Sequence, residues 1–188
     1  MVFKFWINNM LKISFLLIPF LISSCASQLY TPTASAQLKP TSGNITTGAV
    51  TFIIIGDKVR VTAEVQGLKP NAEHGFHVHE KGDCSSGDGL STGGHFNPNS
   101  QAHGVHGSGI HHAGDLPSLK ADASGKAKIT FESSTISVSS GVTNVIGRGL
   151  IIHRDPDDYK TQPTGNAGPR LACAVIVKYA PATISNSY

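Results

Sequence analysis

The segment GFHVHE, residues 75–80, carries two histidines on one face of an expected strand. His77 and His79 stand two positions apart in an apolar stretch, and alternate side chains of a strand point to the same side. Two neutral imidazoles held side by side on a rigid strand supply half of a transition-metal site. The segment therefore predicts both β-structure and a metal centre.

The other histidines fall into separate groups. All nine lie between His74 and His153, and His153 ends the apolar run 149–152. A dense group between them comprises His95, His103, His106, His111 and His112, with Asp115 close behind. The alternative interpretation is scattered surface histidines, or a His-rich tract that binds metal non-specifically. Because the groups lie in different structural contexts that include strand ends, the pattern favours a defined site.

Composition indicates one all-β domain. The chain has 188 residues, of which 20 are glycine and only 14% are charged, and it shows no long helical periodicity. The net charge of +3 is too small to indicate nucleic-acid binding, so no nucleic-acid partner is expected. Strands are expected at residues 50–55, 59–65, 74–80, 116–121, 127–131, 149–153 and 171–179, with hairpin turns at 56–58 and 122–126.

Two long segments, residues 81–114 and 154–169, interrupt these strands. The first is rich in Gly, Ser and His and lacks apolar periodicity. Loops of such length in a compact domain are usually functional. We therefore expect an all-β fold, an eight-stranded Greek-key β-barrel or sandwich with two long functional loops.

The N-terminus has the features of an export signal. Lys4 and Lys12 precede an apolar run at 13–22 that suits a signal peptide and is too short to span a bilayer. The following LISSC, residues 21–25, resembles a bacterial lipobox, which implies cleavage before Cys25 and a lipid anchor on its sulfur. Ordinary secretory cleavage after residues 34–36 is the alternative. The expected segments are a signal peptide at 1–24, a tether at 25–36, a domain at 37–180 and a tail at 181–188.

The cysteine count agrees with export. An exported chain favours disulfides, and the three cysteines, Cys25, Cys84 and Cys173, leave one over. Lipid attachment to Cys25 would leave Cys84 and Cys173 as the natural pair. In the chain-entropy model, a bond that closes so long a loop contributes about 4 kcal/mol.

Three motifs, in order, resemble those of the copper–zinc superoxide dismutase family. They are GFHVHEKGDC at residues 75–84, GGHFNP at 93–98 and GNAGPRLAC at 165–173. The resemblance extends over about residues 36–179. The insertion GDGLST at 87–92 and the loop after His153 are similar to bacterial members, so the chain is identified with a bacterial exported, lipoprotein-like type.

The resemblance implies a role for each motif residue. Cys84 and Cys173 match the family's disulfide, Asp157 its carboxylate that joins a copper ligand to a zinc ligand, and Arg170 its anion-guiding arginine. Arg170 and His95 are the implied catalytic residues. The implied copper ligands are His77, His79, His95 and His153, and the implied zinc ligands are His95, His103, His112 and Asp115.

The implied activity is disproportionation of superoxide to oxygen and hydrogen peroxide by redox cycling of copper at the cell envelope. The implied cofactors are copper and zinc, and the implied partners are superoxide and a membrane reached through Cys25. Family members include homodimers and monomers, so a homodimer and a monomer are both open alternatives. The alternative is a non-catalytic copper- or zinc-binding module on the same fold. Arg170 and the complete copper set favour the enzyme, because a metal buffer needs no anion guide.

Three histidines remain outside the two ligand sets. His74 is expected at the surface or in a hydrogen bond, and His106 is expected to face solvent. His111 adjoins His112, and either could align with the zinc site. The spacing from His112 to Asp115 matches the family's His-x-Gly-Asp pattern, which favours His112.

Overall fold

The computed structural model describes residues 33–180, whose regular secondary structure is β-strand apart from one short 3₁₀ helix. The expected signal peptide, Cys25 and the C-terminal tail lie outside the described residues. Between residues 33 and 180, no helix has the length and apolar character needed to cross a membrane. The elements are β1 Ala34–Pro40, β2 Thr47–Ile55, β3 Lys58–Gln66, β4 Glu73–His74, β5 Phe76–His79, the short 3₁₀ helix η1 Leu90–Thr92, β6 Leu119–Lys120, β7 Ala127–Ser133, β8 Gly149–His153, β9 Arg170–Val175 and β10 Val177–Lys178.

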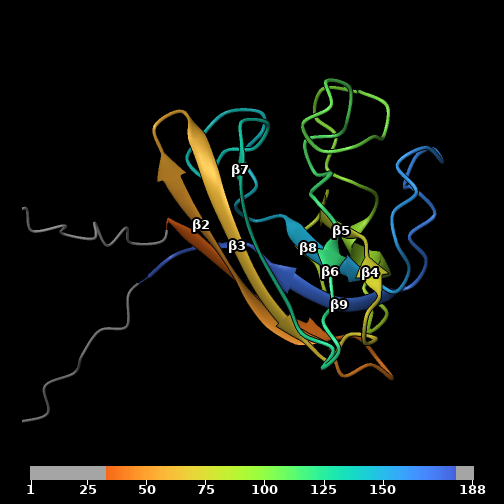
Figure 1. Cartoon of the computed structure of the whole chain (residues 1–188). Coiled ribbons are helices and arrows are strands. Elements are labelled where there is room, and N and C mark those ends of the chain that lie inside the picture. Colours follow the sequence, from red (N-terminus) through yellow and green to blue (C-terminus); the bar gives the residue numbers. More distant parts are fainter. Residues whose placement is uncertain (1–32, 181–188) are drawn as a thin grey trace, which may run out of the picture.

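Eight strands form one antiparallel sheet. Its order is β5-β8-β9-β1-β2-β3-β7, and β10 pairs with β1. The sheet curls, so that the long β2–β3 hairpin stands opposite β5 and β8 (Figure 1). The short strands β4 and β6 pair separately. The curled antiparallel sheet confirms the predicted all-β class.

The β2–β3 hairpin shows why the sequence forms this sheet. Val59, Val61, Ala63 and Val65 alternate with exposed or half-buried residues, so one face of β3 is apolar and the other is wet. Gly56 has φ +60° in the two-residue turn, a conformation that favours glycine. The predicted hairpin is therefore present, and its apolar face belongs to the buried core.

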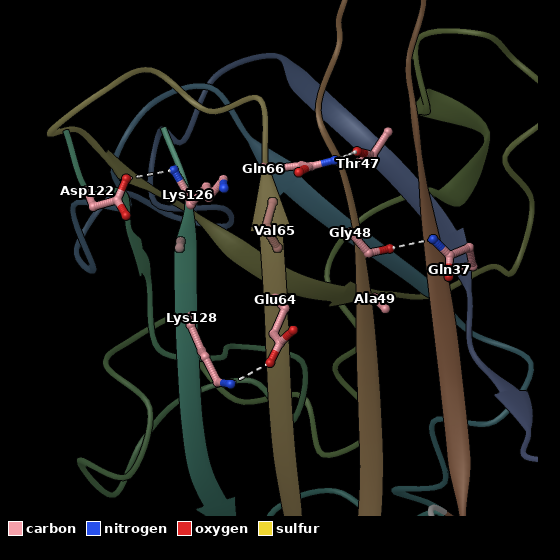
Figure 2. Close-up of a pocket in the computed structure, with 11 residues that line it drawn as sticks. Gln37, Thr47, Gly48, Ala49, Glu64, Val65, Gln66, Asp122, Lys126 and Lys128 are labelled. Carbon is pink, nitrogen blue, oxygen red and sulfur yellow. Dashed lines mark hydrogen bonds and ion pairs between the residues drawn. The ribbon is translucent and has the colours of Figure 1, made fainter. Parts of the chain in front are cut away.

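The outer face of the sheet is polar. Cross-strand pairs cover a shallow depression there, including Gln66 with Thr47, Lys128 with Glu64, and Gln37 with the carbonyl of Gly48 (Figure 2). These pairs satisfy one another, and the lining of the depression contains no histidine.

Strand β1 was not predicted, and its start corrects the expected tether at residues 25–36. Ala34, Ala36 and Leu38 alternate inward and are buried, while β1 pairs with β2 over residues 34–38. Alanine and serine have weak β-propensity, so the segment looks like a tether in isolation. The neighbouring strands supply the hydrogen bonds and the apolar surface that make it a strand.

The turn predicted at residues 122–126 is present, but the strands on either side of it do not pair with each other. Asp122 accepts hydrogen bonds from the N–H groups of Ser124 and Lys126, which shapes the turn as expected. The flanking strands diverge, however, because β6 pairs with β4 and β7 pairs with β3. Local alternation cannot distinguish these partners, since it fixes only which face of a strand is apolar.

Candidate metal centre

Strands β5 and β8 place three histidines on one face of the sheet. Phe76 pairs with Ile152, so the following residues His77 and His79 and the strand end His153 project to the same side. The N–H of His153 donates to the carbonyl of Gly75. A Cβ at Gly75 would lie 3.1 Å from Cε1 of His77, so the glycine leaves room for the rings.

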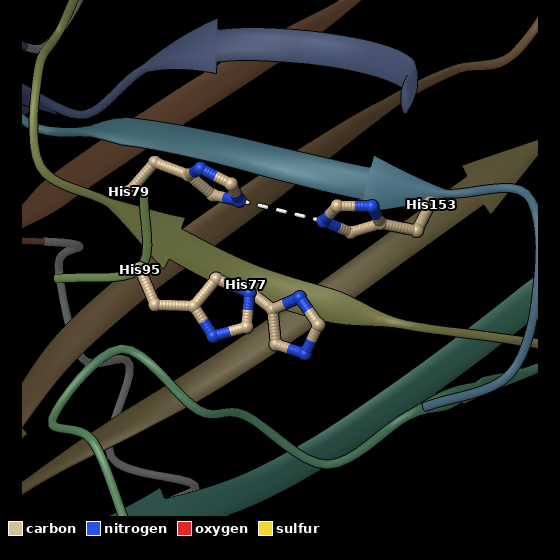
Figure 3. Close-up of side chains that lie close together, drawn as sticks. All are labelled: His77, His79, His95 and His153. Atoms are coloured by element: carbon tan, nitrogen blue, oxygen red, sulfur yellow. Dashed lines mark hydrogen bonds between the residues drawn. The ribbon is translucent and has the colours of Figure 1, made fainter. Parts of the chain in front are cut away.

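His95 reaches the same place from the long loop. The segment around it pairs with the free edge of β5, because Glu80 N–H donates to Gly94 O and Phe96 N–H donates to Val78 O. The ring of His95 lies 4.0 Å from that of His77, centroid to centroid. Nitrogens of His77, His79, His95 and His153 lie within 4.8 Å of one another, and all four residues are buried (Figure 3).

In His79 and His153, the ring nitrogen that points away from the cluster, Nδ1, is hydrogen-bonded to a main-chain carbonyl. His79 Nδ1 donates to Gly93 O at 2.9 Å, and His153 Nδ1 donates to Gly168 O at 3.0 Å. These bonds leave the two Nε2 atoms facing each other at 3.4 Å (Figure 3). A fixed tautomer with its lone pair aimed inward is the form that a metal requires.

A second cluster shares His95. Oδ1 of Asp115 lies 2.9 Å from His95 Nδ1, 3.0 Å from His103 Nδ1 and 3.3 Å from His112 Nδ1. Ligand bonds of about 2.0 Å in a tetrahedron separate the ligand atoms by about 3.3 Å. Three imidazoles and one carboxylate at this spacing fit a closed zinc site.

Asp157 joins the two clusters. Its Oδ2 accepts from His77 Nε2 at 2.7 Å, and its Oδ1 accepts from His103 Nε2 at 2.8 Å. Both rings are thereby oriented with Nδ1 inward. Among residues 33–180, the buried atoms His77 Nδ1 and His95 Nε2 have no hydrogen-bond partner. Buried polar atoms are rarely left unpaired, so these orphans fit bound metal.

Burial favours the neutral form of three imidazoles in the first cluster, those of His79, His95 and His153. Burial lowers the pKa of His95 to about 4, against an opposing effect of Asp115. Burial, together with the nearby His77, lowers the pKa of His153 to about 3. Burial also lowers the pKa of His79 well below 6.5. Neutral rings are the form that can coordinate a metal ion.

Arg170 stands at the start of β9, beside the first cluster. Its guanidinium donates to Gly89 O, to Thr92 Oγ1 at 2.8 Å and to Gly93 O at 2.7 Å. Its charge contributes to the lowered pKa of His79 and His153, after burial and the neighbouring histidines. The side chain is thus a fixed, half-buried cation close to the ring nitrogens.

The loop that holds Arg170 is tied to the sheet by a disulfide. Cys84 in the loop and Cys173 in β9 are bonded, with their Cα atoms 5.9 Å apart. The disulfide predicted from the cysteine count is therefore present.

Comparison with known proteins identifies the family. Residues 46–176 match the family model described as copper/zinc superoxide dismutase. A Cu-Zn superoxide dismutase of Paramecium bursaria Chlorella virus 1 is 46% identical over 135 residues, which are 69% of this chain and 71% of the viral protein. Cu-Zn superoxide dismutase 2 of Aquifex aeolicus is 38% identical over 147 residues, 76% of this chain and 85% of its own.

A solved structure agrees. The crystal structure of the clock protein EA4 superimposes with a TM-score of 0.71 at 39% identity, covering 81% of this chain and 98% of that one.

The chain belongs to the copper/zinc superoxide dismutase family.

Family membership confirms the predicted class of enzyme and the predicted cofactors, copper and zinc. It supports the enzyme over the alternative of a non-catalytic metal-binding module. The structure brings every implied dismutase ligand into one of the two clusters. The assignment of each cluster to its metal remains a prediction.

The three remaining histidines have structural contacts. His74 is buried, and its Nδ1 donates to the carbonyl of His153. His111 is also buried, and its Nδ1 donates to the carbonyl of His112, so His112 is the one that joins the cluster. The expectation that His106 faces solvent is wrong: it is half-buried, packs against Phe131 and donates to the carbonyl of Asp115.

Sequence reasoning found Asp157 but missed two other residues that position the proposed ligands or Arg170. Thr92 anchors Arg170, and Gln162 contacts the main chain of His103. Neither residue belongs to a recognisable functional motif, because single threonines and glutamines are common in loops. Their role follows from contacts between residues far apart in sequence.

Proposed function

We propose that this dismutase disproportionates superoxide at a copper site formed by His77, His79, His95 and His153, next to a zinc site formed by His95, His103, His112 and Asp115. The observation that carries the proposal is His95, whose two ring nitrogens face different clusters. When bound, copper would supply one-electron redox chemistry by alternating between Cu(II) and Cu(I). One superoxide is oxidised to oxygen, and a second takes up one electron and two protons to give hydrogen peroxide.

His95 is suited to hold one of those protons. Its Nδ1 is directed at the Asp115 cluster, and its Nε2 is directed at the His77 cluster with no protein partner. Nε2 can therefore accept a proton while Nδ1 keeps the ring in place. The proton would be stored next to the position where the anion is reduced.

Arg170 would bind the substrate anion. A guanidinium is always charged and has several donors in a fixed plane. Its contacts to Gly89, Thr92 and Gly93 hold it near the histidines before superoxide arrives, so little reorganisation is needed. Attraction of this kind chiefly raises the rate of association.

The residues of the second cluster would serve as a clamp. Oδ2 of Asp115 accepts from the N–H groups of Gly104 and His112, so its Oδ1 is held toward the imidazoles. Zinc has no redox chemistry, and a closed ligand set favours a structural role. Its binding would fix the long loop and, through His95, the edge of the copper site.

The test combines metal analysis with kinetics. Purified protein loaded with copper and zinc should bind one of each and consume pulse-generated superoxide far faster than metal-free protein. Copper and zinc binding without any acceleration would reject the enzyme in favour of the binding module.

The chain is further proposed to be an exported lipoprotein anchored through Cys25, in the periplasm or cell envelope. The Cys84–Cys173 disulfide is consistent with an oxidising compartment. The start of β1 at Ala34 supports cleavage before Cys25, because cleavage after Ala36 would remove buried core residues. Cys25→Ser should release the protein from membranes or leave it unprocessed. A mature N-terminus at Gln37 would contradict the proposal.

Sedimentation of the purified protein would distinguish a homodimer from a monomer.

A further inference from the structure

The loop 154–169 contacts the long histidine loop through a glutamine. Oε1 of Gln162 accepts from the main-chain N–H of His103 at 2.8 Å, and Nε2 of Gln162 donates to the main-chain carbonyl of the same residue at 3.0 Å. One amide thus satisfies both backbone groups of one residue. The arrangement repeats the paired bonds of an antiparallel ladder, although the two residues lie in loops.

Among residues 33–180, no other hydrogen bond reaches the main-chain N–H or carbonyl of His103. Its side chain is buried and bonded to Asp157 of the same second loop. The loop 154–169 therefore fixes His103 twice, at the ring and at the backbone.

Gln162 is itself held firmly. The Asp158 carboxylate accepts from the N–H groups of Lys160 and Thr161 and from the Thr161 hydroxyl, and Gly165 N–H donates to Thr161 O. Nε2 of Gln162 also reaches Lys160 O at 3.3 Å. These local bonds shape the turn that contains Gln162, so the side-chain amide of Gln162 points toward His103 in a defined direction.

We propose that Gln162 is a positioning residue for the zinc ligand His103, an inference that rests on the proposed assignment of His103 to zinc. The direction of Nδ1 depends on where the backbone sits as well as on the ring. Asp157 orients the ring, and Gln162 sets the main chain from which the ring projects. Partners that orient a ligand typically change metal affinity by about ten- to a hundredfold.

The test replaces the amide and keeps the length of the side chain. Gln162→Met should weaken zinc binding by roughly tenfold, measured by chelator competition on the full chain with its disulfide intact. The matched control is Tyr159→Phe, which removes the 2.7 Å bond between the Tyr159 and Ser118 hydroxyls. That bond joins the same loop to Ser118 through a side chain that makes no hydrogen bond to His103, so its loss should leave zinc affinity unchanged.

Two further measurements separate positioning from general loosening. The amide hydrogen of His103 should exchange faster in metal-free Gln162→Met than in Tyr159→Phe, because only the first variant loses its acceptor. Cobalt bound at the zinc site should show altered visible bands in Gln162→Met and parent-like bands in the control. Both readouts are independent of dismutase activity.

The outcomes are distinct. If His103→Ala binds zinc as tightly as the parent, the zinc assignment fails, and the inference fails with it. If His103→Ala loses zinc but Gln162→Met binds with parent affinity and a parent-like cobalt spectrum, only the inference is overturned. Equal weakening in Gln162→Met and Tyr159→Phe would also overturn it, because the loop as a whole would then be responsible.

Discussion

The two clusters are built in different ways. Three residues of the proposed copper set, His77, His79 and His153, lie in strands β5 and β8. The β5–β8 ladder holds the backbone of His77 and His79, and the N–H of His153, at the irregular end of β8, donates to the carbonyl of Gly75. In the proposed zinc set, His103, His112 and Asp115 lie in a loop without regular secondary structure.

The difference teaches that loop-borne ligands need side chains for support. Asp115 holds Gly104 and His112 by their N–H groups, while Asp157 and Gln162 hold His103. A sheet supplies the same support through main-chain bonds, which depend little on the identity of the side chains. Substitutions around the loop should therefore disturb zinc more than copper.

Removing the disulfide tests the covalent bond between the long loop and the sheet, and the expected effect is the largest of those considered. Cys84→Ala combined with Cys173→Ala should lower the free energy of unfolding of the metal-free protein by about 4 kcal/mol, because the open chain regains the entropy of a loop with 89 residues of separation. Denaturant titration measures this. Hydrogen exchange should accelerate more over residues 83–93 than in β5 and β8, whose amides follow only the change in global stability. Uniform acceleration would contradict the contrast between the regions.

His95 belongs to both clusters, so its loss should affect both metals. His95→Ala should keep the fold and lower activity by more than about a hundredfold, since even residues that only orient a ligand are worth about ten- to a hundredfold. Metal analysis and superoxide decay measure the two effects. The matched variant His79→Ala should lose copper affinity and keep zinc. Normal binding of both metals by His95→Ala, with full activity, would refute the shared role.

Gly165 tests how closely the second loop approaches the proposed zinc ligands. It has φ +64°, and a Cβ there would overlap the carboxylate of Asp157 and the ring of His103. Gly165→Ala should weaken zinc by about tenfold to a hundredfold in chelator competition, with copper less affected.

The control for this prediction is Gly56→Ala. Gly56 has φ +60° and no atom near the added Cβ, so it carries only the conformational strain of about 1–2 kcal/mol. Zinc affinity in that variant should equal that of the parent. A similar loss in both variants would mean that backbone strain, and not contact with Asp157 and His103, is responsible.

The smallest expected effect concerns Arg170, a strand residue held by loop carbonyls. Arg170→Ala should lower kcat/KM about tenfold, equal to about 1.4 kcal/mol, with copper content unchanged. Arg170→Glu should be slower than Ala, and Arg170→Lys should fall between parent and Ala, because Lys keeps the charge and loses the planar donors.

Pulse-generated superoxide decay at several salt concentrations measures this effect, which should diminish as salt rises. Arg60→Ala is the control, because it removes the same charge from β3, where Arg60 pairs with Glu132. Equal rates for the Ala and Glu variants at position 170 would show that Arg170 does not guide the anion.

Much of this was predictable from local sequence. Alternation in 59–65, the turn at Gly56 and the paired histidines of 75–80 indicated strands and a metal centre, because these signals depend on neighbours in the chain. The three motifs identified the family, and the odd cysteine count indicated the disulfide that is present. The sequence by itself thus determined the fold class, the family and the residues offered as ligands.

Only the tertiary structure decided what surrounds those ligands. It showed that Ala34 begins a strand, that His106 and His111 support the loop, and that Gln162 holds His103. It also assigned which nitrogen of each ring faces inward, through partners such as Asp157 and Gly168. The physical reason is clearest for Gln162 with His103 and for Asp157 with His77, which are 59 and 80 residues apart in the chain. A lone alanine, glutamine or carbonyl carries no local pattern that identifies its partner.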